Sequence, residues 1–479
     1  MGNNVASTAA GKRIEALLDY KSFVEIGSQV TARNTDFNLG DNKAAGDGVI
    51  CGYGLIEGNL VYVYSQDSTV LGGSVGEMHA RKICSLYDMA MKVGAPVIAL
   101  IDSAGFRLQE SCDALEAAGA IYRKQVVASG VIPQISAVFG NCGGGMALIP
   151  GLSDFTFMEN NAKYFVSAPN TVDGNNAAKC DTASAEFKSA KSGVIDAVGT
   201  EEEIIEMIRN TVAVLPENNE DNQSYSDCED DLNRAVEGAR AYASDPVVLL
   251  GQISDNGLVV EKSGDYMKEM VTALIKLNGI TVGVVANRTE ILGEDGKAVE
   301  KFDARITAGG AKKAAEFVTF CDAFNIPVVT FTNVVGYATD KHSEIRMAGA
   351  VSSLVGAFAG ATVPKINVIT GKAYGSAYVA MNSKGIGADF VYAWDGSEVG
   401  TMDAAMAAKV LCPDADADTL KAKTEEYKNL QNNVNMAAAR GYVDTVIAPE
   451  DTRKYLIGTI EMLFTKREDR PYKKHNSVL

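Results

Sequence analysis

Histidine is scarce in this chain of 479 residues, which contains only three: His79, His342 and His475. So few histidines limit any mechanism that needs an imidazole base or several imidazole metal ligands. Cysteine is more frequent, with eight residues, but no two of them have the C-x-x-C spacing of a zinc site or a redox motif. The sequence therefore predicts no bound metal. It also contains no Walker A motif and no G-x-G-x-x-G fingerprint for nucleotide binding.

Basic residues are also few, with 44 Lys and Arg against 61 Asp and Glu, a formal net charge of −17. This balance argues against nucleic acid and anionic membranes as partners, because both need concentrated positive charge. No apolar run reaches the roughly 18 residues of a membrane span. The first residues lack the basic and apolar regions of a signal peptide, and dispersed cysteines are typical of reduced thiols. We therefore expect a cytoplasmic protein.

The two halves of the chain resemble each other. Five pairs of identical residues share one offset in residue number: Pro96 and Pro327, Gly105 and Gly336, Pro133 and Pro364, Gly140 and Gly371, Gly144 and Gly375. Proline makes up only 11 of the residues, so two such proline pairs are hard to obtain by chance. Further upstream the offset is smaller, as between Gly58 and Gly279, which places about ten extra residues near Glu294 to Asp303. The pattern favours a duplicated domain; two unrelated α/β domains with common turn chemistry are the alternative.

Each half alternates short apolar runs with segments of helical spacing, which is typical of parallel βαβ units. Strands are predicted at 60–65, 97–102, 135–140, 281–286, 328–333 and 366–371. Helices are predicted at 76–93, 111–128, 311–324, 343–358, 416–440 and 451–464. Residues 216–231 are polar and acidic, which is typical of a surface linker, so we expect one domain at 1–215 and a second at 232–479.

Glycine-rich loops follow matching strands in the two halves. Gly143-Gly144-Gly145 comes after the first, and Tyr374-Gly375-Ser376-Ala377 comes after the second. Glycine lets the backbone approach a ligand closely, and the first N–H groups of a helix lack internal partners. Two such groups aimed at one carbonyl oxygen form an oxyanion hole. The alternative interpretation is a tight strand-to-helix turn that packs against a neighbour.

Other loops are weaker candidates. Asp102–Arg107 also ends a predicted strand, and ligands favour the carboxyl ends of parallel strands; a polar turn with a helix cap is the alternative. The Leu71–Gly76 loop is rich in glycine. Ser376 lacks the G-x-S-x-G setting of a hydrolase nucleophile, and no histidine can be assigned to it.

Several longer motifs are similar to those of the carboxyltransferase subunit of biotin-dependent acyl-CoA carboxylases and decarboxylases, of the propionyl-CoA carboxylase β and glutaconyl-CoA decarboxylase α type. The matching segments span nearly the whole chain: 46–49, 65–70, 72–77, 102–110, 320–327, 372–378, 439–444 and 466–471. The resemblance implies an α/β fold of two tandem crotonase-like (ClpP/crotonase) β-β-α superhelix domains. The N-terminal domain would bind acyl-CoA and the C-terminal domain would bind biotin.

The resemblance also implies an activity: transfer of a carboxyl group between carboxybiotin on a separate carrier protein and the α-carbon of a short acyl-CoA, such as acetyl-, propionyl- or glutaconyl/crotonyl-CoA. The N–H groups of Gly144 and Gly145 would hold the thioester oxygen, and those of Ser376 and Ala377 the ureido oxygen of biotin. By position in the matching motifs, further substrate-binding residues would be Gly72, Gly73, Ser103, Ala104, Gly105, Arg107, Gly336, Tyr378 and Val379.

The implied partners are a biotin carboxyl carrier protein, a biotin carboxylase or a membrane decarboxylase subunit, and further copies of this chain. A dimer would be the smallest functional unit and a hexamer the usual assembly. The chain departs from the family pattern at Val335, Ser376 and Val379, so the resemblance leaves the identity of the substrate open; Val379 lies where the family's acyl pocket would be, and Ser376 would add a hydroxyl near biotin. Alternatives are the α subunit of a sodium-pumping decarboxylase, a crotonase-type hydratase or hydrolase in which Glu110 is the nearby carboxylate, and a non-catalytic subunit of a complex.

Overall fold

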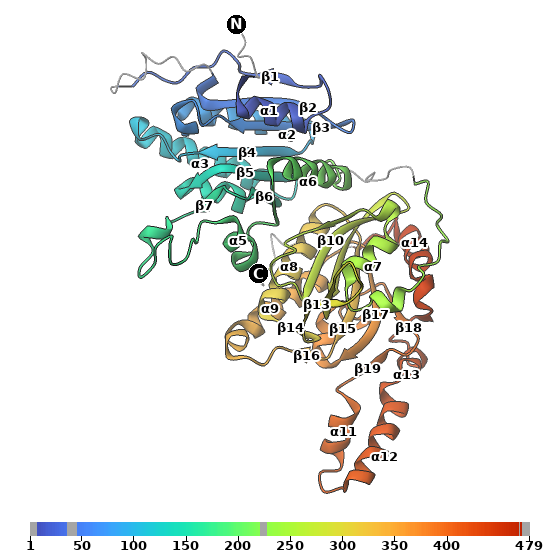
Figure 1. Cartoon of the computed structure of the whole chain (residues 1–479). Coiled ribbons are helices and arrows are strands. Elements are labelled where there is room, and N and C mark those ends of the chain that lie inside the picture. Colours follow the sequence, from blue (N-terminus) through green and yellow to red (C-terminus); the bar gives the residue numbers. More distant parts are fainter. Residues whose placement is uncertain (1–6, 36–45, 221–227, 469, 472–479) are drawn as a thin grey trace. The chain divides into compact units, whose positions relative to one another are not determined.

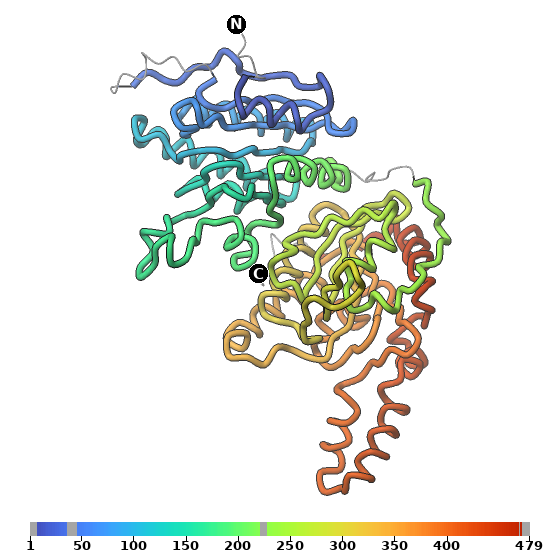
Figure 2. Tube along the Cα trace, viewed as in Figure 1, coloured from blue at the N-terminus to red at the C-terminus, as the bar shows by residue number. Residues whose placement is uncertain are grey.

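The computed structural model describes residues 7–35, 46–220, 228–468 and 470–471 (Figures 1 and 2). The chain divides into two compact units, Met1–Ser224 with Lys262–Tyr266, and Tyr225–Glu261 with Met267–Leu479. Residues 221–227 of the predicted linker lie outside the described residues. Lys262–Tyr266 group with the first unit, although they lie well beyond that linker in the sequence.

The first unit is built on an eight-stranded sheet with the order β1-β2-β3-β4-β5-β6-β8, in which β7 also pairs with β5. Strand β2 is antiparallel to both of its neighbours, β1 and β3, and every pairing from β3 to β8 is parallel. The strands are β1 (Val24–Ile26), β2 (Val49–Ile56), β3 (Asn59–Gln66), β4 (Val97–Ser103), β5 (Gln134–Gly143), β6 (Phe155–Glu159), β7 (Lys163–Phe165) and β8 (Ala197–Gly199). The helices are α1 (Ala9–Leu17), α2 (Glu77–Val93), α3 (Cys112–Ala128), α4 (Leu148–Gly151), α5 (Ala185–Phe187) and α6 (Glu201–Val214).

The second unit repeats this arrangement with the order β20-β18-β17-β15-β11-β10-β9, in which β19 also pairs with β17. The sheet strands are β9 (Val259–Glu261), β10 (Met270–Leu277), β11 (Ile280–Asn287), β15 (Val328–Val334), β17 (Lys365–Tyr374), β18 (Phe390–Trp394), β19 (Glu398–Gly400) and β20 (Thr445–Ile447). Short strands off this sheet are β12 (Glu290–Leu292), β13 (Ala298–Lys301), β14 (Arg305–Ile306) and β16 (Gly336–Tyr337). The helices are α7 (Pro246–Ile253), α8 (Ala308–Ala323), α9 (Lys341–Gly360), α10 (Gly375–Ala380), α11 (Ala404–Leu411), α12 (Ala417–Tyr427), α13 (Val434–Ala439) and α14 (Thr452–Leu463).

The matching strand order confirms the duplication expected from the sequence. Both ends of β4 and β15, and of β5 and β17, are displaced by the offset that separates Gly144 from Gly375. Both ends of β2 and β10, and of β3 and β11, are displaced by the smaller offset that separates Gly58 from Gly279. The extra residues of the second half form the β12–β13 hairpin. The predicted helix at 416–440 is wrong in its middle, because a wide helical turn at Lys428–Asn432 separates α12 from α13.

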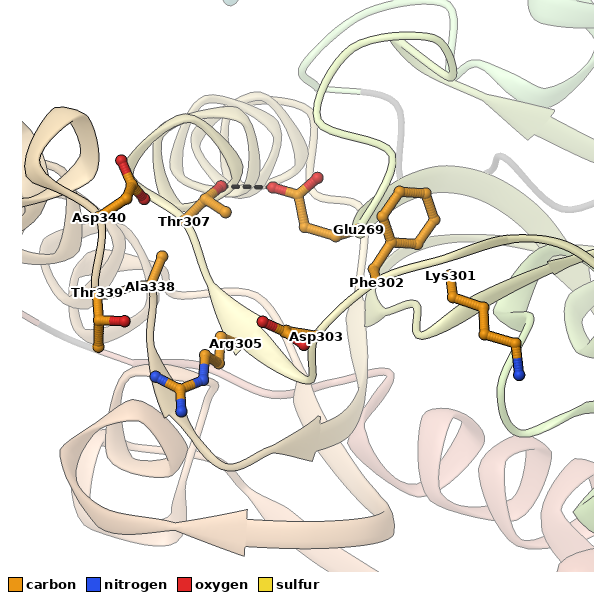
Figure 3. Close-up of a pocket in the computed structure, with 9 residues that line it drawn as sticks. All are labelled: Glu269, Lys301, Phe302, Asp303, Arg305, Thr307, Ala338, Thr339 and Asp340. Atoms are coloured by element: carbon orange, nitrogen blue, oxygen red, sulfur yellow. Dashed lines mark hydrogen bonds between the residues drawn. The ribbon is translucent and has the colours of Figure 1, made fainter.

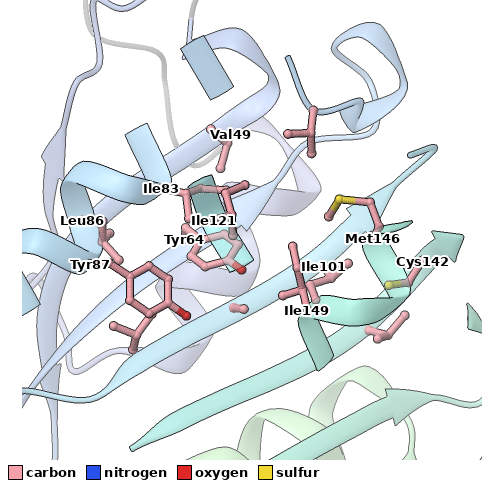
Figure 4. Close-up of a cluster of buried hydrophobic side chains, with 14 of the residues drawn as sticks. Val49, Tyr64, Ile83, Leu86, Tyr87, Ile101, Ile121, Cys142, Met146 and Ile149 are labelled. Atoms are coloured by element: carbon pink, nitrogen blue, oxygen red, sulfur yellow. The ribbon is translucent and has the colours of Figure 1, made fainter. Parts of the chain in front are cut away.

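The core of the first unit lies between the sheet and the helices α2 and α3 (Figure 4). Val97, Ala99 and Ile101 of β4 belong to this cluster. The intervening Ile98 and Leu100 are equally buried, so β4 is covered on both faces. Because neighbouring side chains of a strand point to opposite faces, this explains its continuous apolar sequence. A strand buried in this way holds the loop at its carboxyl end in a fixed place.

Lys262 fixes the strap Lys262–Tyr266 in the first unit. Its ammonium lies 3.1 Å from the Asp196 carboxylate and 4.5 Å from the centroid of the Phe155 ring, and it also donates to the carbonyl oxygen of Asp154. Ser263 donates to the same Asp196 carboxylate at 2.6 Å. The strap therefore covers the beginning of β6 with charged groups that neutralise one another.

Asp154 should make the stability of the first unit fall as the pH rises through about 4 to 6. Burial raises the pKa of this carboxyl to about 6, against the lowering effects of the Gln134 N–H and Lys262. The folded chain therefore binds a proton more tightly than the unfolded chain, so folding loses free energy as that proton dissociates. We expect Asp154→Asn, which keeps an acceptor for the Gln134 N–H, to remove this loss, on the order of 2–3 kcal/mol at pH 7. Urea unfolding at pH 4.5 and 7 measures it; an equal pH dependence in both proteins would contradict the assignment.

Candidate functional site

The first glycine loop begins where β5 ends. Residues Gly144–Ala147 form a short helical turn that continues into α4, and Gly144 has a φ of +62°. A Cβ atom at Gly144 would meet no atom within 4 Å, so the space in front of this peptide is open. The N–H groups of Gly144 and Gly145 are the first two of the turn and have no carbonyl partner within it. The loop therefore offers two backbone donors to a ligand.

Gly145 is held from behind by two aromatic side chains. The Tyr122 hydroxyl donates to the carbonyl oxygen of Gly145 at 2.6 Å. A Cβ atom at Gly145 would overlap the Phe106 ring and lie 2.9 Å from the Tyr122 oxygen, so no other residue fits there without a shift. These contacts fix the direction of the peptide that carries the donors.

The glycine-rich loop Leu71–Gly76 contacts the loop Asp102–Arg107, which follows β4. Ala104 donates its N–H to the carbonyl oxygen of Gly72 at 2.9 Å, and the Ser103 hydroxyl donates to that of Gly73 at 2.8 Å. Gly105 in turn faces the end of β5, because its Cβ position lies 3.8 Å from the carbonyl oxygen of Gly143. Gly72 and Gly73 therefore contact the segment Ser103–Gly105, which in turn approaches the end of β5, and the role of these residues in substrate binding stays a prediction.

The Arg107 side chain is buried and is occupied by partners within the protein. Its side chain is 1 % exposed and donates to Asp47 at 2.6 Å, to Glu110 at 2.8 Å and to the carbonyl oxygen of Ser74 at 2.6 Å. The predicted direct contact between Arg107 and the substrate is therefore replaced by a supporting role. The sequence motif could not show this, because the Asp47 carboxylate comes from a segment 60 residues away.

His79 completes the same buried cluster as a neutral ring. Its Nδ1 lies 2.9 Å from the carbonyl oxygen of Asp47, and its Nε2 lies 3.1 Å from Nε2 of Gln66. Burial, with the nearby Arg107, lowers the pKa of His79 to about 3. A ring that donates through Nδ1 and accepts through Nε2 has no nitrogen left for substrate, so His79 is structural.

The second glycine loop has the same form. β17 ends at Tyr374, Gly375 has a φ of +60°, and α10 begins there. Ser376 is exposed and Ala377 is buried, which leaves the Ser376 peptide at the surface. The offset that relates Gly144 to Gly375 also pairs Gly145 with Ser376. Each predicted donor pair therefore includes the second residue of its turn, which is Gly145 in the first unit and Ser376 in the second.

Three further residues predicted to bind substrate, Gly336, Tyr378 and Val379, belong to α10 or to a strand that contacts it. Val379 is 42 % exposed, whereas Tyr378 is largely buried, which raises the pKa of its phenol to about 12. The segment β16, which contains Gly336, pairs with β14 and contacts α10. A Cβ atom at Gly336 would meet nothing within 4 Å, so the position is open. The structure thus places Gly336, Tyr378 and Val379 around the start of α10.

A cavity of about 510 Å³ lies in the second unit beside β14, and sequence analysis did not anticipate it (Figure 3). Thr307 donates to Glu269 at its edge, and Arg305, which also lines it, donates to the carbonyl oxygen of Tyr337 at 3.2 Å. The offset between Gly144 and Gly375 also pairs Arg107 with Ala338. The second unit therefore has no guanidinium at this position of the repeat. The lining residues are Glu269, Lys301, Phe302, Asp303, Arg305, Thr307, Ala338, Thr339 and Asp340.

The described part of the chain offers neither a metal site nor a membrane span. Among these residues, no group of three or more His, Cys, Asp or Glu side chains is placed to hold a metal ion. Within the same ranges, no helix combines the length and the apolar character that a membrane span requires.

Comparison with known proteins identifies the class of enzyme to which this duplicated fold belongs: a carboxyltransferase. Residues 4–478 match the family of the carboxyl transferase domain, and the chain belongs to this family. It is 38% identical over 486 residues to the propionyl-CoA carboxylase beta chain of Roseobacter denitrificans, covering 98% of this chain and 93% of that protein. It is 37% identical over 490 residues to the methylmalonyl-CoA decarboxylase subunit alpha of Propionigenium modestum, covering 98% and 92%.

A solved structure confirms the predicted fold of two tandem crotonase-like domains. Transcarboxylase 12S, described as a hexamer with hydrolysed methylmalonyl-coenzyme A bound, matches with a TM-score of 0.91 and 35% identity. The match covers 99% of this chain and 93% of that one. The chain is therefore an enzyme of the acyl-CoA carboxyltransferase class.

Arg107→Met should destabilise the first unit by about 3–5 kcal/mol, because it leaves the buried Asp47 and Glu110 carboxylates without a cation. Urea unfolding followed by far-ultraviolet circular dichroism measures the change. The matched control is Arg81→Met, because Arg81 is 66% exposed and pairs with Glu77 one helical turn away. That exposed pair is worth less than about 1 kcal/mol. Equal losses in the two variants would show that the buried cluster does not support the unit.

Proposed function

We propose that this chain transfers a carboxyl group between carboxybiotin on a separate carrier protein and the α-carbon of a short acyl-CoA. The observation that carries the proposal is the pair of open backbone loops at equivalent strand ends of a duplicated fold. One loop suits a thioester oxygen and the other suits a ureido oxygen, since both oxygens gain negative charge during transfer. The likeness to carboxylase, decarboxylase and transcarboxylase chains supports this chemistry.

In the first unit, the N–H groups of Gly144 and Gly145 would hold the thioester carbonyl oxygen. The space in front of Gly144 is open, and the Gly145 peptide is fixed by Tyr122. Donors fixed in advance stabilise charge without reorganising, and each is worth roughly 3 kcal/mol of activation free energy. The surrounding residues Gly72, Gly73 and Ser103–Gly105 would line the acyl-CoA site, which we assign to the predicted domain 1–215.

In the second unit, the N–H groups of Ser376 and Ala377 would hold the ureido oxygen of biotin, which we assign to the predicted domain 232–479. The exposed start of α10 and the open position at Gly336 fit a flat polar ring. When bound, biotin supplies the carboxyl group and the basic nitrogen that takes the α-proton. Val379, exposed beside this loop, would influence which acyl group is accepted.

No histidine is needed as a base, and His79 is not available as one, because its ring is buried and fully hydrogen-bonded. A hydratase would instead need a free carboxylate near the first loop. Glu110, the nearby candidate, is 3 % exposed and accepts from Arg107 and from the Glu77 N–H at 2.6 Å. These contacts favour carboxyl transfer over water addition.

The partners we propose are a biotin carboxyl carrier protein, a biotin carboxylase or a membrane decarboxylase subunit, and further copies of this chain in a dimer or hexamer. The likeness to methylmalonyl-CoA decarboxylase subunit alpha makes decarboxylation a second candidate direction. Both directions use the same two loops, so the structure fits either.

Release of CO2 from methylmalonyl-CoA, malonyl-CoA and glutaconyl-CoA, measured with and without free biotin, tests the function. We expect release that depends on biotin, with one thioester preferred. If none of the three releases CO2, the assay is repeated with a purified biotin carrier protein. Continued inactivity of the folded protein would refute the proposed function and favour a non-catalytic subunit.

Gly144→Val should lower the biotin-dependent rate at least 100-fold, because a β-branched residue is strained at positive φ and would project into the open space. The matched control is Gly119→Ala in α3, where a Cβ atom meets nothing within 4 Å. We expect that control to retain the wild-type rate and to gain helix stability. A folded Gly144→Val protein with full activity would refute the placement of the first oxyanion hole.

A further inference from the structure

The same irregularity interrupts the central strand pair of both units. In the first unit, Ile101 pairs with Val138, but Ser103 pairs with Cys142, so β5 contains extra residues opposite Asp102. In the second unit, Thr332 pairs with Ile369, but Val334 pairs with Ala373, so β17 contains extra residues opposite Asn333. Such a bulge bends a strand and redirects the residues after it. In both units, a glycine loop with open N–H groups comes within a few residues of the bulge.

Each bulge frees a backbone N–H group that the neighbouring strand no longer accepts, and a side chain on that strand accepts it instead. The Asn141 N–H donates to Oδ1 of Asp102 at 3.3 Å. The Lys372 N–H donates to Oδ1 of Asn333 at 3.0 Å. The two acceptors, and likewise the two donors, are related by the offset between the repeats. An interaction preserved at both copies of a duplicated fold serves the geometry that the copies share.

A glycine precedes each donor because the accepting side chain occupies the place of a Cβ atom. At Gly140, a Cβ atom would overlap the Asp102 carboxylate. At Gly371, it would lie 2.7 Å from Oδ1 of Asn333. Neither glycine needs an unusual φ, so the requirement is for space alone. The side chain therefore lies directly against the bulged strand.

We propose that Asp102 and Asn333 are the positioning residues of the two oxyanion holes. By holding the bulge, Asp102 directs the N–H groups of Gly144 and Gly145, and Asn333 directs those of Ser376 and Ala377. Beyond each bulge the strand pairs again on its other side, Cys142 with Tyr164 of β7 and Ala373 with Val399 of β19, which carries the new direction into the loop. The inference rests on the proposed function.

The two copies differ in charge, and the difference shows which property of the side chain is required. The Asp102 carboxylate also accepts from the Ser68 hydroxyl at 2.8 Å and lies 3.8 Å from the Arg13 guanidinium. Asn333 carries no charge and is held by its own N–H group, which donates to Oδ1 of Asn287 at 3.1 Å. Since a neutral amide performs the same task, the requirement is an oxygen acceptor of this length and not a negative charge.

The test compares variants that keep the acceptor with variants that remove it. Asp102→Leu and Asn333→Leu preserve approximate volume without an acceptor, whereas Asp102→Asn and Asn333→Asp retain one. We expect each Leu variant to lower kcat for biotin-dependent CO2 release at least tenfold. The KM for free biotin should stay within twofold in Asp102→Leu, and the Kd for the acyl-CoA should stay within twofold in Asn333→Leu. The acceptor-retaining variants should restore most of the rate.

A second readout does not depend on activity. Backbone hydrogen exchange should rise in the peptide that contains Gly144 for Asp102→Leu, and in the peptide that contains Ser376 for Asn333→Leu, without a change in the other unit. If the Leu variants do not fold, Gly140→Ala and Gly371→Ala displace the acceptors by steric overlap. Their controls are the surface helix changes Gly119→Ala and Gly349→Ala, which meet no atom within 4 Å.

Three outcomes would overturn the proposal: folded Leu variants with wild-type kcat, unchanged hydrogen exchange in both loops, or an Asp102→Asn variant as impaired as Asp102→Leu. A failure of the proposed function is a different result. In that case the wild-type protein itself shows no biotin-dependent release, and the exchange pattern alone decides whether Asp102 and Asn333 hold the loops.

Discussion

The proposed function places one requirement on each unit: two backbone N–H groups must remain without a protein partner at the end of a buried parallel strand. An unpaired N–H group is normally costly, and helix starts are the regular place where a chain leaves several of them open. The chain meets the requirement by placing a glycine with positive φ directly after β5 and after β17, as the first residue of a helical turn. The surrounding contacts, such as that of Tyr122 with Gly145, then keep those donors from turning inward.

The duplication shows which parts of this arrangement are fixed and which are free to change. Strand order, strand ends and the bulge before each loop are the same in both units. The residues behind the loops differ, because the first unit contains the buried Arg107 cluster, whereas the offset places Ala338, which lines a cavity, at the matching position of the second unit. A guanidinium between two buried carboxylates is stable only when all three charges are present. The matching position of the second copy, Ala338, carries no charge.

Much of the fold was predictable because it depends on local patterns. Apolar runs indicated the strands, and the repeated offsets indicated their correspondence, since an insertion such as the β12–β13 hairpin changes an offset without hiding it. The features that were missed depend on contacts between distant segments. Arg107 was interpreted as a ligand contact because its motif is local, whereas Asp47 reaches it from another loop. The pairing of Lys262 with Asp196 and the acceptor role of Asp102 likewise exist only after folding.

Because the proposed reaction uses backbone donors, the groups that stabilise charge differ from the side chains that select the substrate. A backbone N–H group does not titrate, and it is present whichever side chain its residue carries. Ser376 in the second loop therefore keeps its backbone donor. Under the proposed function, an exposed side chain such as Val379 could then change with the acyl group without altering these donors. The contacts behind the loops matter for the rate in this proposal, because a donor displaced by a fraction of an ångström no longer meets the oxygen on which charge develops. In this proposal, residues that touch no substrate, such as Asp102 and Asn333, therefore influence the rate through the direction of the donors that they hold.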